Sequence, residues 1–163
     1  MGVKGTKGLN RCYTSVVLVK KKMSQEEKIP PGAKLFSFPY RRTRMGGFDD
    51  TILISFKTRK VIKSRLHTTR SGNHGTRQYL LFPGRYVMYT VSRSNLGNVY
   101  ITVEVVAVSN GEMNTLVQLA LYEGQEQKAQ LSELDDEVRT LLLSNKDHLP
   151  LFRYLEAPGV GVE

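Results

Sequence analysis

Cysteine, tryptophan and long apolar runs are scarce in this sequence. Cys12 is its single cysteine, and none of its 163 residues is tryptophan. A single cysteine excludes an intrachain disulfide, and no apolar run approaches the roughly 18 residues of a transmembrane helix. The opening Met-Gly-Val-Lys also lacks the apolar stretch of a secretory signal. These absences predict a protein of a reducing, intracellular compartment.

Catalytic and metal-binding motifs are missing as well. The three histidines, His67, His74 and His148, have no cysteine or carboxylate at the spacing of a zinc site. No nucleophile elbow, phosphate-binding glycine loop or dinucleotide fingerprint occurs. Asp49 and Asp50 follow two glycines, a pattern that favours a turn over an acid–base pair. We therefore expect no enzyme activity, no cofactor and no metal.

Acidic residues are rare in the first part of the chain. Residues 1–100 hold 20 Lys and Arg but only 4 Asp and Glu, a formal charge of +16, whereas residues 101–163 hold 4 and 11, a charge of −7. The first part has too few acids to pair its cations, so it is expected to bind an anionic partner. The alternative is that both parts simply present solvated faces.

The length and the 40% of apolar residues predict one folded domain with flexible ends. We expect a basic arm at 1–11, a core domain at 12–155 and a tail at 156–163. Runs of β-branched, aromatic or alternating residues predict six to seven strands, within 11–20, 35–38, 51–58, 61–66, 85–92, 99–108 and 113–122. The segment 68–78 has no apolar residue and is predicted to be a loop.

Two local signals fix the second half of the predicted fold. Asn110-Gly111 stands between the last two predicted strands and suits a two-residue hairpin turn, because both positions need positive φ. Ser132 followed by several acids, with Leu134, Val138 and Leu141 on one face, predicts a helix that ends near Asn145. The fold class predicted is therefore mainly β, an antiparallel sheet or sandwich with a C-terminal α-helix.

Three basic segments are candidates for nucleic-acid or other anion binding. The run Lys20-Lys21-Lys22 suits nonspecific contact with phosphates. In the second, Tyr40, expected to be exposed for base stacking, stands beside phosphate-binding arginines. The third is the long predicted loop, which could close over RNA or enter a neighbouring subunit. The candidate residues of the second and third segments are Tyr40, Arg41, Arg42, Arg44, Arg70 and Arg77.

The N-terminus fits the short pattern for N-myristoylation, with Gly2 as the acceptor and Thr6 as the hydroxyl residue. One acyl chain binds membranes weakly, so neighbouring cations would have to add attraction to anionic lipid. Lys4, Lys7 and Arg11 could do so. A basic arm without a lipid is the alternative reading.

Self-association is the third expected property. Glu133, Asp136 and Glu137 are predicted to lie opposite the apolar face of the C-terminal helix, where they could meet the basic surface of another copy. The alternative is again a solvated acidic face. We therefore expect the chain itself to be one of its partners, beside RNA, a nucleocapsid or an anionic membrane surface.

The order of a Gly/Lys arm, the Pro30-Pro31 loop, a compact β core and a terminal helix resembles the matrix proteins of negative-strand RNA viruses, especially the short ones of plant rhabdoviruses. The resemblance implies an oligomeric structural protein of the virion and host cytoplasm or nucleus, which condenses the nucleocapsid and links it to the envelope. The chain departs from the Pro-Pro-x-Tyr of animal rhabdoviruses, having Gly32-Ala33 after the prolines, so a budding role is not carried over.

Three other functions remain open on the sequence alone. The first is an RNA-binding viral accessory protein or suppressor of silencing, without a membrane role. The second is a small viral capsid subunit, although a jelly roll needs about eight strands. The third, an enzyme, would require Asp49, Asp50 and a histidine to meet in one pocket.

Overall fold

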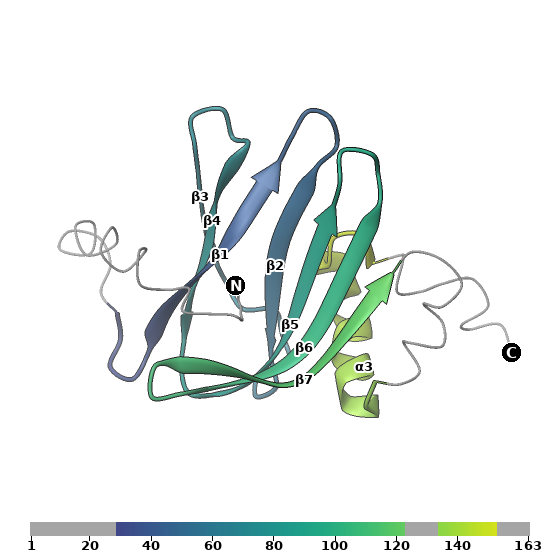
Figure 1. The fold of residues 1–163 in the computed structure, drawn as a ribbon. Coiled ribbons are helices and arrows are strands. Elements are labelled where there is room, and N and C mark those ends of the chain that lie inside the picture. Colours follow the sequence, from purple (N-terminus) through teal and green to yellow (C-terminus); the bar gives the residue numbers. More distant parts are fainter. Residues whose placement is uncertain (1–28, 123–133, 153–163) are drawn as a thin grey trace, which may run out of the picture.

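The computed structural model describes residues 29–122 and 134–152. These residues form one seven-stranded antiparallel sheet, with strand order β3-β4-β1-β2-β5-β6-β7, and one α-helix (Figure 1). The strands are β1 (Lys34–Arg42), β2 (Phe48–Ser55), β3 (Arg65–Thr68), β4 (His74–Leu81), β5 (Gly84–Arg93), β6 (Val99–Ser109) and β7 (Glu112–Tyr122). The helix α3 (Asp136–Ser144) is followed by a short 3-10 turn, η1 (Lys146–His148). The predicted fold class is confirmed.

Strand β5 shows how the two faces of the sheet are used. Its side chains alternate between two buried clusters, because successive residues of a strand point to opposite faces. Val87, Tyr89 and Val91 belong to the first cluster, whereas Tyr86 and Met88 belong to the second. The sheet is therefore apolar on both faces along this strand.

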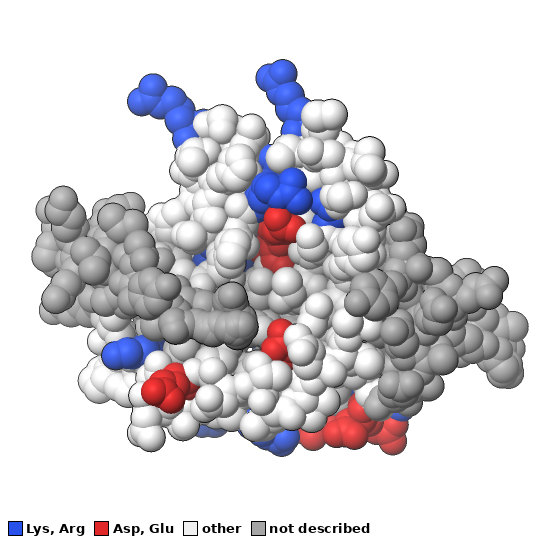
Figure 2. All heavy atoms as spheres, viewed as in Figure 1, with Lys and Arg blue, Asp and Glu red and all other residues white. Residues whose placement is uncertain are grey.

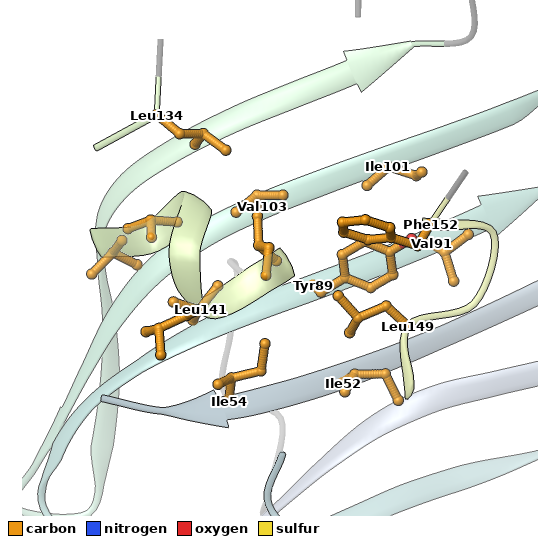
Figure 3. Close-up of a cluster of buried hydrophobic side chains, with 14 of the residues drawn as sticks. Ile52, Ile54, Tyr89, Val91, Ile101, Val103, Leu134, Leu141, Leu149 and Phe152 are labelled. Carbon is orange, nitrogen blue, oxygen red and sulfur yellow. The ribbon is translucent and has the colours of Figure 1, made fainter. Parts of the chain in front are cut away.

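The first cluster lies between the sheet and α3 (Figure 3). The helix contributes Val138, Leu141 and Leu142, which are all buried. They pack against side chains of β2, β5 and β6, including Ile52, Ile54, Ile101 and Val103. Truncation of a buried leucine such as Leu141 to alanine typically costs about 2–5 kcal/mol. The helix is thus attached to the sheet by the apolar face that the sequence predicted.

The bounds of α3 differ slightly from the prediction at one end. Asp135 is the N-cap, and Asn145 is the C-cap as expected. The side-chain amide of Asn145 donates a 2.7 Å hydrogen bond to the carbonyl of Leu141, which ties down the last turn. Ser132, the predicted cap, lies outside the described residues.

Strand β2 changes partner halfway along its length. It pairs with β1 at Arg41↔Asp49 and Arg42↔Phe48. Further on, Ile54 bridges to Val61, which belongs to the connection between β2 and β3. The strands β3, β4 and β1 therefore join the rest of the sheet at only one end, the end that carries the β1–β2 turn (Figure 1).

The second cluster fills the space between these two parts of the sheet. Phe36 and Phe38 of β1 and Tyr79 of β4 pack with Leu53 of β2 and Met88 of β5. The Tyr79 hydroxyl also donates a 2.8 Å hydrogen bond to the carbonyl of Thr51 on β2. Packing and this hydrogen bond hold the divergent strands together.

The β6–β7 hairpin confirms the predicted Asn-Gly turn. Asn110 and Gly111 both have positive φ, 53° and 78°. The register shifts between Val105 and Val106, and Leu116 has no partner at this point. The extra residue of this bulge is therefore on β7, while β6 keeps its regular alternation, with Val105 in the first cluster and Val106 in the second.

Several strand and loop predictions differ from the structure, and one concerns residues that the structure does not describe. Segment 68–78 is not a loop, because β3 and β4 form a hairpin there with a turn at 69–73. Strand β1 does not end at Pro39 but continues to Arg42. The predicted 61–66 strand is divided between the bridge at Val61 and the start of β3. The predicted strand at 11–20 lies outside the described residues.

Candidate anion-binding surface

Three turns meet at one end of the sheet, and we call this surface the loop end. It comprises the β1–β2, β3–β4 and β5–β6 turns with the strand ends that carry them, at residues 41–47, 69–74 and 93–98. The Arg42 amide donates to the carbonyl of Asn73 at 2.8 Å, which joins the first two turns. Thr43 Oγ1 donates to Asn95 Oδ1 at 2.8 Å, which joins the first and third. The three turns thus form one connected surface.

Gly47 lies at the centre of these contacts. A Cβ atom at this position would stand 2.1 Å from Arg41 Nη1, 2.6 Å from Asn95 Oδ1 and 2.9 Å from Thr43 Oγ1. Real Cβ atoms do not approach other atoms so closely, so only glycine fits without displacing the neighbouring side chains. The Gly47 amide also donates to Thr43 Oγ1 at 2.8 Å. Close packing of backbone and side chains therefore sets the shape of the loop end.

Three arginines of the loop end are exposed to solvent. Arg42 stands at the end of β1, Arg44 in the β1–β2 turn and Arg70 in the β3–β4 turn. None of the three makes an ion pair with another described residue. Figure 2 shows Lys and Arg side chains that project beyond the rest of the surface at this end. These guanidinium groups are available to an anionic partner.

Two further arginines of the loop end are used to hold its frame. Arg41 Nε donates to Asp49 Oδ2 at 2.7 Å, and Arg41 Nη2 donates to the Arg93 carbonyl at 3.1 Å. Arg93 Nε in turn donates to the Gly46 carbonyl at 2.7 Å. Ser92 completes the arrangement with a 2.6 Å hydrogen bond to Asp49. Arg41 is therefore a scaffold residue of this surface rather than an exposed contact.

The charge of the loop end is strongly one-sided. It contains five arginines and no Asp or Glu. The two acids just below it, Asp49 and Asp50, each pair with an arginine, Arg41 and Arg77. When Arg77 and the two aspartates are added to the five arginines of the loop end, the net charge is +4. Both carboxylates near this surface are therefore already paired with arginines, so neither repels an approaching anion as an unpaired charge would.

Two residues predicted to contact nucleic acid make contacts within the protein instead, Tyr40 in the core and Arg77 in a partly buried position. Tyr40 is buried, with its ring edge-on to Phe48 at 6.2 Å and the Arg77 guanidinium 5.8 Å from its centroid. Arg77 is bonded to Asp50 and to Ser64 Oγ. Base stacking on an exposed Tyr40 is therefore excluded by its packing, and the charge of Arg77 is neutralised by a buried carboxylate.

The remaining predicted residues divide into two groups. Asp136 and Glu137 are exposed in the first turn of α3, where Asp136 pairs with Arg139 and Glu137 lies 3.8 Å from Arg59. The second group lies outside the described residues, so its contacts stay predictions. It consists of Gly2, Lys4, Lys7, Arg11, Lys20, Lys21, Lys22 and Glu133.

Sequence reasoning missed the β5–β6 turn as part of this surface. The segment from Ser94 to Asn98 is rich in turn-forming residues, and nothing in it indicates the contact of Asn95 with Thr43. It also missed that Met45 and Leu96, one in each of two adjacent turns, would be strongly exposed. A single apolar residue in a turn has no periodic signal, and only the fold shows that the two turns are joined, through Thr43 and Asn95.

Comparisons with known proteins add no identification. No protein-family model, no curated protein and no solved structure matches the chain. In the part of the chain that the structure describes, no group of three or more His, Cys, Asp or Glu is placed to hold a metal ion. No helix formed by these residues is long and apolar enough to cross a membrane. The geometry of the loop end is thus the observation on which a function can be based.

Proposed function

We propose that this protein acts by binding, without catalysis, and that the loop end contacts the phosphate groups of an anionic partner. The observation that carries the proposal is the exposure of Arg42, Arg44 and Arg70 on turns that are hydrogen-bonded to one another. Because the turns are fixed, less conformational entropy is lost when a partner binds.

Arginine suits this role better than lysine. Its planar guanidinium can donate two parallel hydrogen bonds to a phosphate, and it stays charged at all physiological pH values. All five cations of the loop end are arginines. By contrast, Lys57, Lys60 and Lys63 are grouped in the β2–β3 connection, at the opposite end of β2. The distribution favours phosphate recognition at the loop end over general solubility.

A charge-reversal comparison would test the site. The triple change Arg42→Glu, Arg44→Glu and Arg70→Glu should abolish most binding of single-stranded RNA and reduce the salt slope by roughly 2, since each phosphate contact contributes about 0.7. Arg41 is excluded from the variant because its bond to Asp49 supports the fold. Fluorescence anisotropy of a labelled RNA across a salt series would measure both quantities.

The matched control changes three exposed lysines, Lys57, Lys60 and Lys63, to glutamate. It makes the same charge change of −6 away from the loop end. If both variants lose RNA binding equally, attraction is a property of net charge, and the loop end has no special role. If only the arginine variant loses it, the proposal is supported.

At the level of biological role, we infer a self-assembling structural protein of the matrix type, with a nucleocapsid or RNA and an anionic membrane surface as partners. The layout of the chain and the separation of its basic and acidic parts support this role. An RNA-binding accessory protein is the alternative, and membrane flotation separates the two. A capsid subunit is less favoured, because the described residues make one open sheet instead of the two packed sheets of a jelly roll.

A further inference from the structure

Two apolar side chains stand out at the loop end. Leu96 is 89% exposed and Met45 is 73% exposed, while no other large hydrophobic side chain in the described part of the chain exceeds 57%. Exposed apolar side chains are common when scattered singly. Here the two extreme cases lie on two turns that share a hydrogen bond between Thr43 and Asn95.

The surroundings of these side chains identify the kind of surface that they fit. Met45 follows Arg44 directly, and the exposed Arg42 and Arg70 lie on the same connected surface. A lipid bilayer presents phosphates and anionic headgroups above an apolar interior, so it can satisfy arginines and aliphatic tips together. RNA would instead favour exposed aromatic rings, and the loop end itself contains no Phe, Tyr or Trp. Tyr40, just before it, is buried, and the half-exposed Tyr100 lies beyond the third turn, on β6.

We propose that the partner of the loop end is the surface of an anionic phospholipid bilayer, into which Met45 and Leu96 insert while the exposed arginines bind headgroup phosphates. The inference rests on the proposed function, since it names the source of the phosphate that the arginines contact. Neither a transmembrane helix nor an acyl chain at Gly2 is needed for this contact.

Vesicle flotation of the full chain would test the proposal. Protein made in bacteria, which do not myristoylate Gly2, should bind phosphatidylcholine vesicles that contain phosphatidylserine and bind pure phosphatidylcholine vesicles far less. The double change Met45→Ser and Leu96→Ser should weaken vesicle binding roughly tenfold or more, given the usual value of burying such side chains. It should leave RNA affinity unchanged, because the arginines remain.

A matched control replaces two exposed apolar residues away from the loop end, Phe82 and Leu116, with serine. This variant should bind vesicles as well as the wild type. The absence of tryptophan gives a second, direct readout. The Leu96→Trp variant should show a blue-shifted emission with anionic vesicles and quenching by lipids brominated in the acyl chain, whereas Leu116→Trp should show neither.

The outcomes separate the two proposals. If the Met45→Ser, Leu96→Ser variant floats with vesicles like the wild type, or if the indole of the Leu96→Trp variant is not quenched, insertion is wrong, although the arginine site stands. If the wild type binds RNA through the arginines but binds no vesicles, the partner is RNA and the membrane inference is overturned. If the triple Arg→Glu variant binds both ligands normally, the proposed function itself fails.

Discussion

Arg77 on β4 and the buried Asp50 on β2 form an ion pair with two parallel hydrogen bonds, at the end of the sheet where β1 pairs with β2. Arg77 Nε donates to Asp50 Oδ1 at 2.7 Å, and Nη2 donates to Oδ2 at 3.0 Å. The Asp50 side chain is only 4% exposed. Burial alone would lower the pKa of Arg77, but its hydrogen bond to Asp50 and the carboxylate charge outweigh burial and raise the pKa. Arg77 therefore stays charged, and its bond to Asp50 connects two strands that are not neighbours in the sheet.

Breaking this pair should be costly. We expect Asp50→Ala to lower the free energy of unfolding by about 1.5–3 kcal/mol, because it removes charge-assisted hydrogen bonds and leaves the partly buried Arg77 without its carboxylate partner. Asp49→Ala, which breaks the more exposed pair with Arg41, should cost only about 1 kcal/mol. Urea unfolding followed by circular dichroism would give both values. If the two variants lose the same free energy of unfolding, the burial of Asp50 does not make its ion pair more stabilising than that of Asp49.

The pair also explains why the sequence prediction failed around Arg77. Segment 68–78 has no apolar residue, so its local sequence predicts a loop. It folds as a hairpin because β4 pairs along β1 from Lys34↔Leu81 to Arg41↔His74 and because Asp50, 27 residues away, neutralises Arg77. The sequence of the segment alone indicates neither its pairing with β1 nor the ion pair with Asp50. By contrast, the alternation of Ile52 and Ile54 and the Asn110-Gly111 turn depend only on local chemistry and were predicted correctly.

The candidate site was predictable in composition but not in geometry. Charge counting indicated a basic surface in the first 100 residues, and Arg42, Arg44 and Arg70 are indeed exposed. The sequence could not separate them from Arg41 and Arg77, because the acids that bind these two come from β2. Whether an arginine is free to bind a partner is decided by tertiary contacts.

Gly47 offers a test of the frame beneath the exposed arginines. A methyl group at this position would collide with Arg41, Thr43 and Asn95, so Gly47→Ala should push the first and third turns apart. Crowding of this kind typically costs about 1–3 kcal/mol. We expect Gly47→Ala to lower both the stability and the RNA affinity of the protein.

A glycine in the neighbouring turn provides the comparison for Gly47→Ala. Gly72 has a φ of +80° and no atom near its Cβ position, so Gly72→Ala should cost about 1–2 kcal/mol through backbone strain alone. It should leave RNA affinity nearly unchanged in the folded protein. A Gly47→Ala variant with wild-type stability and affinity would refute the close packing at the centre of the loop end.

Buried tyrosines should make the protein sensitive to alkali. Burial is the main cause that raises the pKa of Tyr79, and burial also raises the pKa of Tyr89. Above about pH 10 the unfolded chain releases these protons while the folded chain keeps them, so stability is full below pH 10 and falls as the pH rises further. Tyr79→Phe should reduce this slope, although it also removes the hydrogen bond to Thr51.

Two simultaneous measurements check the tyrosine prediction. Ultraviolet absorbance reports tyrosinate, and circular dichroism reports the fold during an alkaline titration. The absorbance change sums over all eight tyrosines of the chain. Tyr79 and Tyr89 should ionise only as the sheet unfolds. Complete ionisation of all eight in the folded state would contradict their burial.

The acidic start of α3 carries the prediction on self-assembly. The Asp136 side chain is 95% exposed, and Glu137 is half exposed, 3.8 Å from Arg59. Surface pairs of this kind contribute little to stability, so Asp136→Lys with Glu137→Lys should fold normally. If subunits join head to tail through these acids and the exposed arginines of the loop end, the contact is heterologous and can propagate.

Light scattering across a salt series would decide whether this acidic face joins subunits. Wild-type assemblies should shrink as salt rises, because exposed charges are screened over about 8 Å at physiological ionic strength. The Asp136→Lys, Glu137→Lys variant should stay small at all salt concentrations and bind RNA at least as tightly. Glu112→Lys with Asp147→Lys makes the same charge change at other exposed acids and should still assemble. Should both variants assemble like the wild type, the first turn of α3 is a solvated face whose acids lie against Arg139 and Arg59 of the same subunit.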